Sequence, residues 1–208
     1  KRSFCPAVWS PDSKHFALVR SDRSKIKDLR VMNAIANPRP RLESYKYQMP
    51  GEPSPKQYLY LFNMESKEGK VIKTDAFKDQ SLSIRRAPMT HAHLYNKYNP
   101  SKWIGDNNKF YISRTSRDLK RVDICTVNVD SDSCNTVIEE RLNTYVETRD
   151  LKVINNGAEL IHWSERDGWA HLYLYGADGK LKNRITKGDF HVEEILGIDQ
   201  ARRVVYFT

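Results

Sequence analysis

Histidine and cysteine are the residues of this sequence that could bind a metal ion. His91 and His93 stand two positions apart, so a β-strand would place both imidazoles on one side, as a metal site needs. No Asp, Glu or Cys stands close by in the sequence as a third ligand. We therefore interpret both as loop or edge histidines, and we predict neither a metal nor any other cofactor.

The three cysteines, Cys5, Cys125 and Cys134, form no C-x-x-C pair, which argues against a zinc or redox site. A tight turn at residues 130–133 would pair Cys134 with Val129 rather than with Cys125. A disulfide between Cys125 and Cys134 would need a wider loop and is the alternative. We expect the cysteines to act as small buried apolar residues.

Charge and composition limit the class of protein. The chain has 208 residues and a net charge of +9; it is 39% hydrophobic and 29% charged, which is typical of a soluble globular chain. Residues 1–100 contain 19 Lys and Arg against 9 Asp and Glu, so the basic excess lies in the first half. These residues are spread through loops rather than clustered with aromatics, which argues against nucleic-acid binding. No apolar run is long enough to cross a membrane, and no signal peptide opens the chain, although a secreted parent could have lost one.

A short sequence pattern recurs four times, and the strands that it predicts must position any site in the chain. In each copy, the apolar end of one predicted strand is followed by a turn rich in Pro, Gly, Asp or Asn. The turn contains a Lys, Glu or Arg, and a second apolar strand follows it. The copies begin at Val8, Trp103, Val153 and Gly197. Short strands repeating every 40–50 residues or so are the sequence mark of β-propeller blades. We therefore predict an all-β partial propeller of four-stranded antiparallel blades.

The predicted blades follow this repeat. Blade 1 covers about residues 4–78, blade 2 about 101–141 and blade 3 about 145–188, and residues 191–208 start the next blade. Residues 76–100 are ambiguous. Within blade 1, residues 21–56 contain five prolines, which remove donors from a β-ladder, so we predict an inserted arm there with a hairpin near 42–47.

Four stretches carry a family resemblance. They lie at residues 9–14, 38–56, 113–123 and 164–189, and the last begins Ser164-Glu165-Arg166-Asp167-Gly168-Trp169. In that order they resemble the N-terminal propeller domain of the dipeptidyl peptidase IV branch of the prolyl oligopeptidase family. The resemblance implies a parent that joins a propeller to an α/β-hydrolase domain and removes dipeptides from peptide N-termini with a Ser-Asp-His triad.

The catalytic machinery of that family is missing from these residues. The nucleophilic serine sits in a G-x-S-x-G turn, and the sequence contains none. We therefore predict no catalytic residue in this chain. In the family, two glutamates just before the first Trp-Ser-Pro phrase bind the amino terminus of the substrate, and this chain begins at Lys1, after that point. The dipeptides Glu139-Glu140 and Glu193-Glu194 fall elsewhere, and we interpret them as solvated strand ends.

The resemblance also suggests substrate-binding and dimer-forming residues. An aromatic residue and an arginine ahead of the third blade line the family's substrate pocket, and Tyr145 and Arg149 are the nearest candidates. The alternative is a tyrosine packed at a blade edge and a surface arginine. An arm from the first blade crosses the family's dimer, which makes Tyr45 and Tyr47 candidate contacts between two copies.

Two functions remain open. The first is a non-catalytic propeller portion of a dipeptidyl-peptidase-IV-like serine exopeptidase, which gates and positions peptides for an α/β-hydrolase domain of the same parent. Its parent would be secreted, periplasmic or in the cell envelope. The second is a stand-alone propeller that binds a protein or ligand without peptidase activity.

Overall fold

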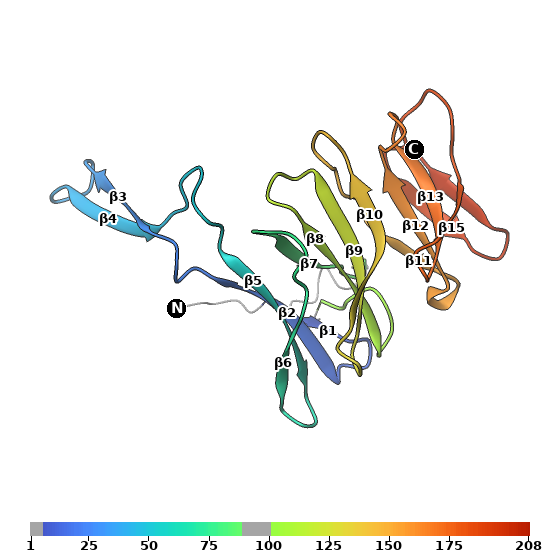
Figure 1. Cartoon of the computed structure of the whole chain (residues 1–208), viewed down its shortest axis with the longest axis horizontal. Helices are drawn as coiled ribbons and strands as arrows, with labels where there is room; N and C mark the ends of the chain where they lie inside the picture. Colours follow the sequence, from blue (N-terminus) through green and yellow to red (C-terminus); the bar gives the residue numbers. More distant parts are fainter. Residues whose placement is uncertain (1–5, 89–100) are drawn as a thin grey trace.

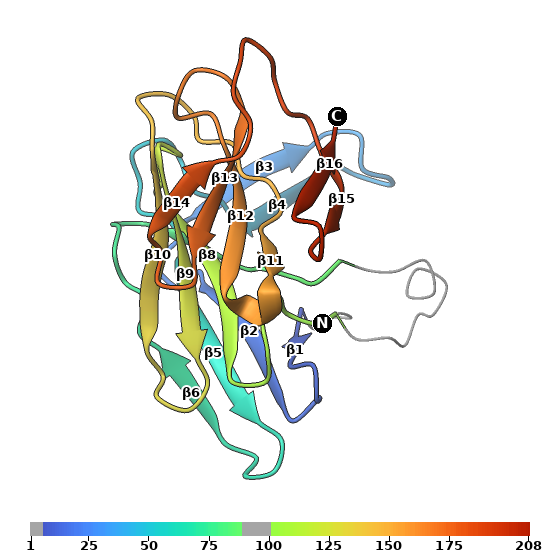
Figure 2. The same ribbon diagram turned by 90° about the vertical axis from the view of Figure 1, so that its right-hand side faces the viewer.

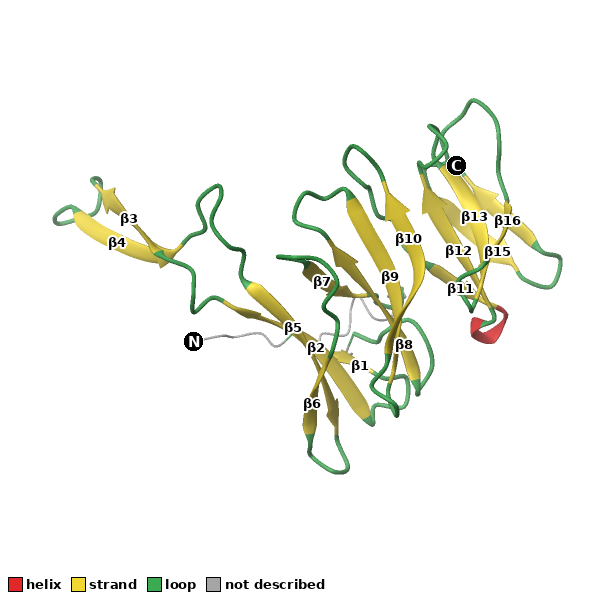
Figure 3. Ribbon diagram, in the orientation of Figure 1, coloured by secondary structure: helices red, strands yellow, loops and turns green. Residues whose placement is uncertain are grey.

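The computed structural model describes residues 6–88 and 101–208. Three four-stranded antiparallel sheets stand side by side like blades, followed by a two-stranded hairpin, and a second hairpin projects far from the first sheet (Figure 1). The helical content of these described ranges is one 3₁₀ turn, η1, at Asn155–Gly157 (Figure 3). This all-β arrangement confirms the predicted partial propeller.

The first sheet has the strand order β1-β2-β5-β6. Its strands are β1 (Val8–Trp9), β2 (His15–Asp22), β5 (Lys56–Asn63) and β6 (Gly69–Ile72). The predicted turn between the first two strands is closed by side chains. The Ser10 hydroxyl donates to Asp12 (2.6 Å) and accepts from the backbone N–H of His15 (2.9 Å), so a Ser-x-Asp phrase satisfies the local backbone as turn chemistry requires.

The arm leaves this sheet between β2 and β5. It is a hairpin of β3 (Asp28–Asn33) and β4 (Arg41–Lys46), longer than the hairpin predicted near 42–47. Every residue of β4 is exposed, so the arm has no core of its own. Two strands without a packed face are marginal in isolation, and the arm is therefore suited to packing against another surface.

The second sheet begins earlier than predicted. Its order is β10-β9-β8-β7, with the strands β7 (Ser81–Ile84), β8 (Lys109–Thr115), β9 (Arg121–Asn128) and β10 (Cys134–Arg141). We predicted blade 2 from about residue 101, but its first strand is β7 at residues 81–84, inside the segment 76–100 that we found ambiguous. Residues 101–104 instead form single bridges, because Lys102 pairs with Trp9 and Trp103 with Arg86, which ties the first two sheets together.

The cysteine register also differs from the prediction. Cys134 lies opposite Val127 rather than Val129, and Cys125 lies opposite Thr136. Both thiols are free; Cys125 is buried and Cys134 is half-buried, so they act as apolar packing residues. Cys5 lies outside the described residues.

The third sheet lies within the predicted bounds of blade 3, about residues 145–188. Its order is β11-β12-β13-β14, with β11 (Lys152–Ile154), β12 (Glu159–Ser164), β13 (His171–Gly176) and β14 (Leu181–Arg184). The final hairpin pairs β15 (Ile195–Asp199) with β16 (Val204–Phe207). All residues of β12 and β13 are buried, as expected for strands covered on both faces.

Figure 2 shows the sheets one behind another. The core clusters join residues of neighbouring sheets, and alternate residues of one strand belong to different clusters. Phe110 and Ile112 of β8 join the cluster shared with the first sheet, whereas Tyr111 joins the cluster shared with the third. A third cluster packs Trp163 and Leu172 against the final hairpin. Each sheet is thus held by burial against the next, which is how propeller blades are stabilised.

The connections divide between two ends of the sheets. Loops 116–120, 142–151, 165–170 and 185–194 lie at the end from which the arm projects (Figures 1 and 3). The four recurring turns lie at the opposite end. Sites at the two ends are therefore built from different parts of each repeat.

Candidate functional site

The loop that carries Tyr145 and Arg149 is anchored to the second sheet. The Leu142 N–H donates to the Lys120 carbonyl oxygen (3.0 Å), and the Val146 N–H donates to the Leu119 carbonyl oxygen (2.9 Å). Val146 is buried, which turns the neighbouring Tyr145 outward, and Tyr145 is 59% exposed. Tyr145 is therefore free to meet a ligand or another surface at the arm end.

Arg149 is held by three contacts rather than loose at the surface. Its guanidinium lies 5.3 Å from the centre of the Trp163 ring and pairs with Glu147 (2.9 Å) and Glu193 (3.3 Å). Its carbonyl oxygen accepts a hydrogen bond from the Arg85 guanidinium (3.1 Å). Such contacts fix the direction of a long side chain and leave it prepared to bind an acceptor.

A cavity of about 420 Å³ adjoins Arg149. Trp163 and Ile195 form its apolar part, and Asp150, Glu193 and Glu194 supply carboxylates. Tyr145 is not among the lining residues, so the structure brings Arg149 to this cavity but leaves Tyr145 beside it. Glu193 and Glu194 are exposed directly before β15, as predicted for a solvated strand end, and they also line this cavity, where Glu193 lies 3.3 Å from His191.

Glu140 is not a solvated strand end, which corrects the prediction for the first Glu-Glu pair. Glu139 is exposed, but Glu140 is buried against the third sheet. Its carboxylate lies 3.1 Å from His162 Nε2, accepts from the Ser164 hydroxyl (2.9 Å) and pairs with Arg166. The period-2 pattern contained the signal, because Glu140 shares a face with the buried Ile138 two residues earlier.

These residues include a serine, a histidine and a carboxylate, but they do not form a nucleophilic triad. A triad places the histidine between the nucleophile and the acid. Here the carboxylate lies in the middle, with Ser164 on one oxygen and His162 on the other. Both side chains are buried, so neither can reach a peptide. The cluster fixes the second sheet to the third and supports the loop above it.

Burial lowers the pKa of His162, although the neighbouring Glu140 carboxylate acts in the opposite sense. Burial alone would raise the pKa of Glu140, but the hydrogen bonds and charges of His162 and Arg166 outweigh it and lower that pKa. The pair therefore consists of a neutral imidazole and an ionised carboxylate. Both groups take up protons more readily in the unfolded chain than in the folded one.

We expect the free energy of unfolding to decrease as the pH falls below about 6.5, the pKa of an unfolded histidine. His162 contributes first, and Glu140 adds to the loss below about 4.3. Denaturant titrations from pH 7.5 to 5 would measure the slope. His162→Gln keeps a donor for Glu140 but cannot titrate, so its slope between pH 6.5 and 5 should be smaller; an unchanged slope would refute the assignment.

The other predicted residues are placed as follows. Tyr45 and Tyr47 lie on the exposed arm with their rings edge to face at 6.4 Å. His91 and His93 lie outside the described residues. Within residues 6–88 and 101–208, no group of three His, Cys, Asp or Glu side chains is arranged to hold a metal. No helix in those same ranges has the length and apolarity needed to span a bilayer.

The sequence matches the family described as the dipeptidyl peptidase IV (DPP IV) N-terminal region over residues 3–208. This chain belongs to the DPP IV N-terminal region family. The match covers nearly the whole chain, including the loop of Tyr145 and Arg149.

Similar proteins agree with this DPP IV assignment. The probable dipeptidyl peptidase 4 of Aspergillus flavus is 29% identical over 209 residues, which cover 97% of this chain and 26% of that protein. Dipeptidyl peptidase 4 of Trichophyton rubrum is 26% identical with the same coverage. The crystal structure of Porphyromonas gingivalis dipeptidyl peptidase 4 aligns with a TM-score of 0.74 at 25% identity, over 97% of this chain and 26% of that one. The chain thus spans about a quarter of the length of these relatives.

Proposed function

We propose that this chain is the non-catalytic propeller portion of a serine exopeptidase similar to dipeptidyl peptidase 4. In this proposal it gates and positions peptides, and an α/β-hydrolase domain elsewhere in the same protein releases the N-terminal dipeptide. The family match over residues 3–208 carries the proposal. The relatives are about four times as long as this chain, which leaves room for such a domain.

The arm end is the side that would face the substrate. Exposed Tyr145 offers an aromatic surface, and Arg149 offers guanidinium donors beside a cavity that also contains carboxylates. An arginine held by Glu147, Glu193 and Trp163 can donate to a peptide carbonyl without first losing side-chain freedom. Glu140 lies near the end of β10, from which this loop begins, and its hydrogen bonds join that strand to the third sheet.

The test uses the full-length protein and a chromogenic alanyl- or prolyl-dipeptide substrate. A hydrogen bond from a charged donor contributes about 1.5–3 kcal/mol, so Arg149→Ala should lower kcat/KM about tenfold to a hundredfold. Tyr145→Ala should also lower kcat/KM, and its exposed position makes misfolding an unsuitable explanation. Arg202→Ala is the control, because that arginine is 81% exposed in the turn of the final hairpin at the opposite end.

The same assay separates the two candidate functions. Turnover by the full-length protein, with none from the 208-residue chain, supports the exopeptidase. A full-length protein that does not cleave the substrate would favour a stand-alone binding propeller. Equal kcat/KM values for Arg149→Ala and Arg202→Ala would show that Arg149 does not bind the substrate. The family assignment would not be affected.

We further propose that the arm joins two copies of the protein. Tyr45 and Tyr47 are exposed on a hairpin without a core, and tyrosines contribute large contact area at low entropic cost. Replacing both by serine should shift the protein toward monomer in sedimentation experiments.

A location outside the cytoplasm remains part of the proposal and would be tested by fractionating the source cells.

A further inference from the structure

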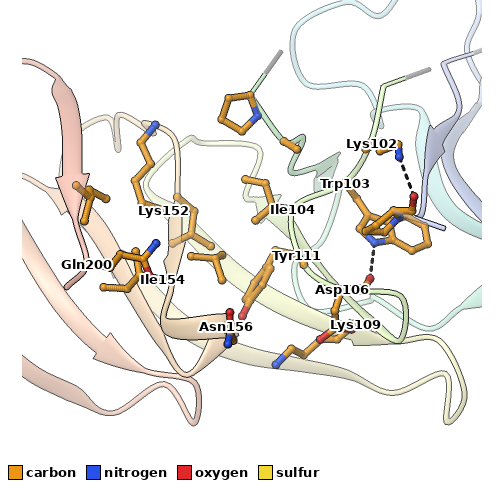
Figure 4. A pocket seen from close by; sticks show the side chains of 18 residues that line it. Lys102, Trp103, Ile104, Asp106, Lys109, Tyr111, Lys152, Ile154, Asn156 and Gln200 are labelled. Carbon is orange, nitrogen blue, oxygen red and sulfur yellow. Dashed lines mark hydrogen bonds between the residues drawn. The ribbon is translucent and has the colours of Figure 1, made fainter. Parts of the chain in front are cut away.

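The four recurring turns meet around one cavity at the end opposite the arm. The cavity has a volume of about 700 Å³. Each turn contributes to its lining, through Pro11, Asp106, Asn156 and Gln200 (Figure 4). The repeat that builds the blades therefore also builds a single site, which neither the family match nor the proposed function uses.

The lining carries more positive than negative charge. Lys102, Lys109 and Lys152 line it together with one carboxylate, Asp106. That carboxylate already accepts from the backbone N–H groups of Asn108 (2.8 Å) and Lys109 (2.7 Å), so it is engaged in its own turn. Lys102 donates to the Pro11 carbonyl oxygen (2.7 Å).

Lys109 and Lys152 form no ion pair within the parts of the chain that the structure describes. The remaining residues, 1–5 and 89–100, contain no Asp or Glu in their sequence and so cannot supply a side-chain carboxylate. Asp106 is the one carboxylate in the lining of this cavity against three lysines, so the lining keeps a net positive charge. An anion from outside would be attracted to it.

One corner of the cavity has a donor set suited to an anionic group. Figure 4 shows Lys109, Tyr111 and Asn156 together there. Tyr111 is completely buried, and its hydroxyl has no hydrogen-bond partner in residues 6–88 and 101–208. An unpaired buried hydroxyl is costly, so an entering oxygen that accepts from it is favoured over a carbon atom.

The adjoining wall is apolar. Ile104 and Ile154 line the cavity (Figure 4), and Val153 also belongs to the lining. A ligand site of this volume usually combines an apolar wall with a few placed polar groups. The combination favours an organic anion over an inorganic one, because an inorganic ion would leave the wall uncovered.

We propose that this cavity binds a small organic carboxylate with an apolar body. The carboxylate accepts from Lys109, Tyr111 and Asn156, and the apolar body covers Ile104 and Ile154. Short acyl amino acids and peptide C-termini share this chemistry. The corner formed by Lys109, Tyr111 and Asn156 lies outside the lining of the cavity at Arg149, although Lys152 lines both cavities. The proposal uses neither Tyr145 nor Arg149, so it is independent of the proposed peptidase function.

Calorimetric titration of the full-length protein with N-acetyl-L-phenylalanine and with its amide tests the proposal. The two probes differ in the charged group, and the acid should bind at least tenfold more tightly. Lys109→Met should weaken binding of the acid about tenfold, and Tyr111→Phe should weaken it severalfold without lowering the melting temperature. Lys14→Met is the matched control, because Lys14 occupies the equivalent place in the first turn, outside this lining.

Three outcomes would overturn the proposal. Equal affinity for the acid and the amide would exclude carboxylate recognition. Equal effects of Lys109→Met and Lys14→Met, with both variants folded, would exclude the assigned corner. Inorganic phosphate binding as tightly as the acid would remove the role of the apolar wall.

Discussion

Replacing Glu140 by alanine is expected to lower the free energy of unfolding by about 3–5 kcal/mol, the usual cost of removing one partner from a buried ion pair. The loss leaves Arg166 without its carboxylate, and it leaves His162 and the Ser164 hydroxyl without their acceptor. His162 and Ser164 belong to β12 of the third sheet and Arg166 to the loop that follows it, whereas Glu140 belongs to the second sheet. The variant should therefore loosen the contact between two blades as well as one strand.

Glu139→Ala provides a control one residue away. Its side chain is 63% exposed and contacts only Arg141 as an ion-pair partner within the described residues, so its removal should change the free energy by less than about 0.5 kcal/mol. Denaturant titrations at pH 7 would measure both variants. If Glu140→Ala were no less stable than Glu139→Ala, the buried cluster would have no structural role.

The turns of the repeat could be predicted because their chemistry is local. Ser10 and Asp12 bond to backbone groups within five residues, so the sequence itself contains both partners. The copy that begins at Val153 predicted the turn between β11 and β12 for the same reason. Local turn signals and period-2 alternation together indicate most strands of a propeller.

Features that depend on distant partners could not be predicted. β7 is only four residues long, with two apolar side chains, and it is a strand because β8 lies beside it. The partners of Glu140 stand 22 to 26 residues further along the chain, so its burial follows from blade packing. Arg149 likewise gains its fixed position from Trp163 of the next sheet.

The distinction between local and distant contacts also explains why the two ends of the molecule differ. At one end, the recurring turns have similar sequences and local contacts. They line one cavity because the blades that carry them lie side by side. At the other end, loops of unlike length and sequence connect the same strands. Variation is tolerated in such loops because the rigid sheets below hold their ends in place, and binding residues are commonly found there.

Replacing Trp103 by alanine is expected to lower the free energy of unfolding by about 3–5 kcal/mol, as for other large aromatic residues removed from a core. Trp103 is buried between the first two sheets, and its ring stacks on Phe110 with centroids 4.5 Å apart. Its indole N–H donates to the Asp106 carbonyl oxygen (2.9 Å) and so also closes the second recurring turn. The substitution removes core volume and a turn contact together.

Trp169→Ala is the matched control, because the same side chain is removed from a hairpin loop where it is 46% exposed. Its expected loss is about 1 kcal/mol or less, since much of its surface already faces water. Thermal and denaturant unfolding of both variants would test the difference. Similar losses for the two tryptophans would mean that the Trp103 segment does not join the first two blades, and the packing that positions both ends of the molecule would have to be revised.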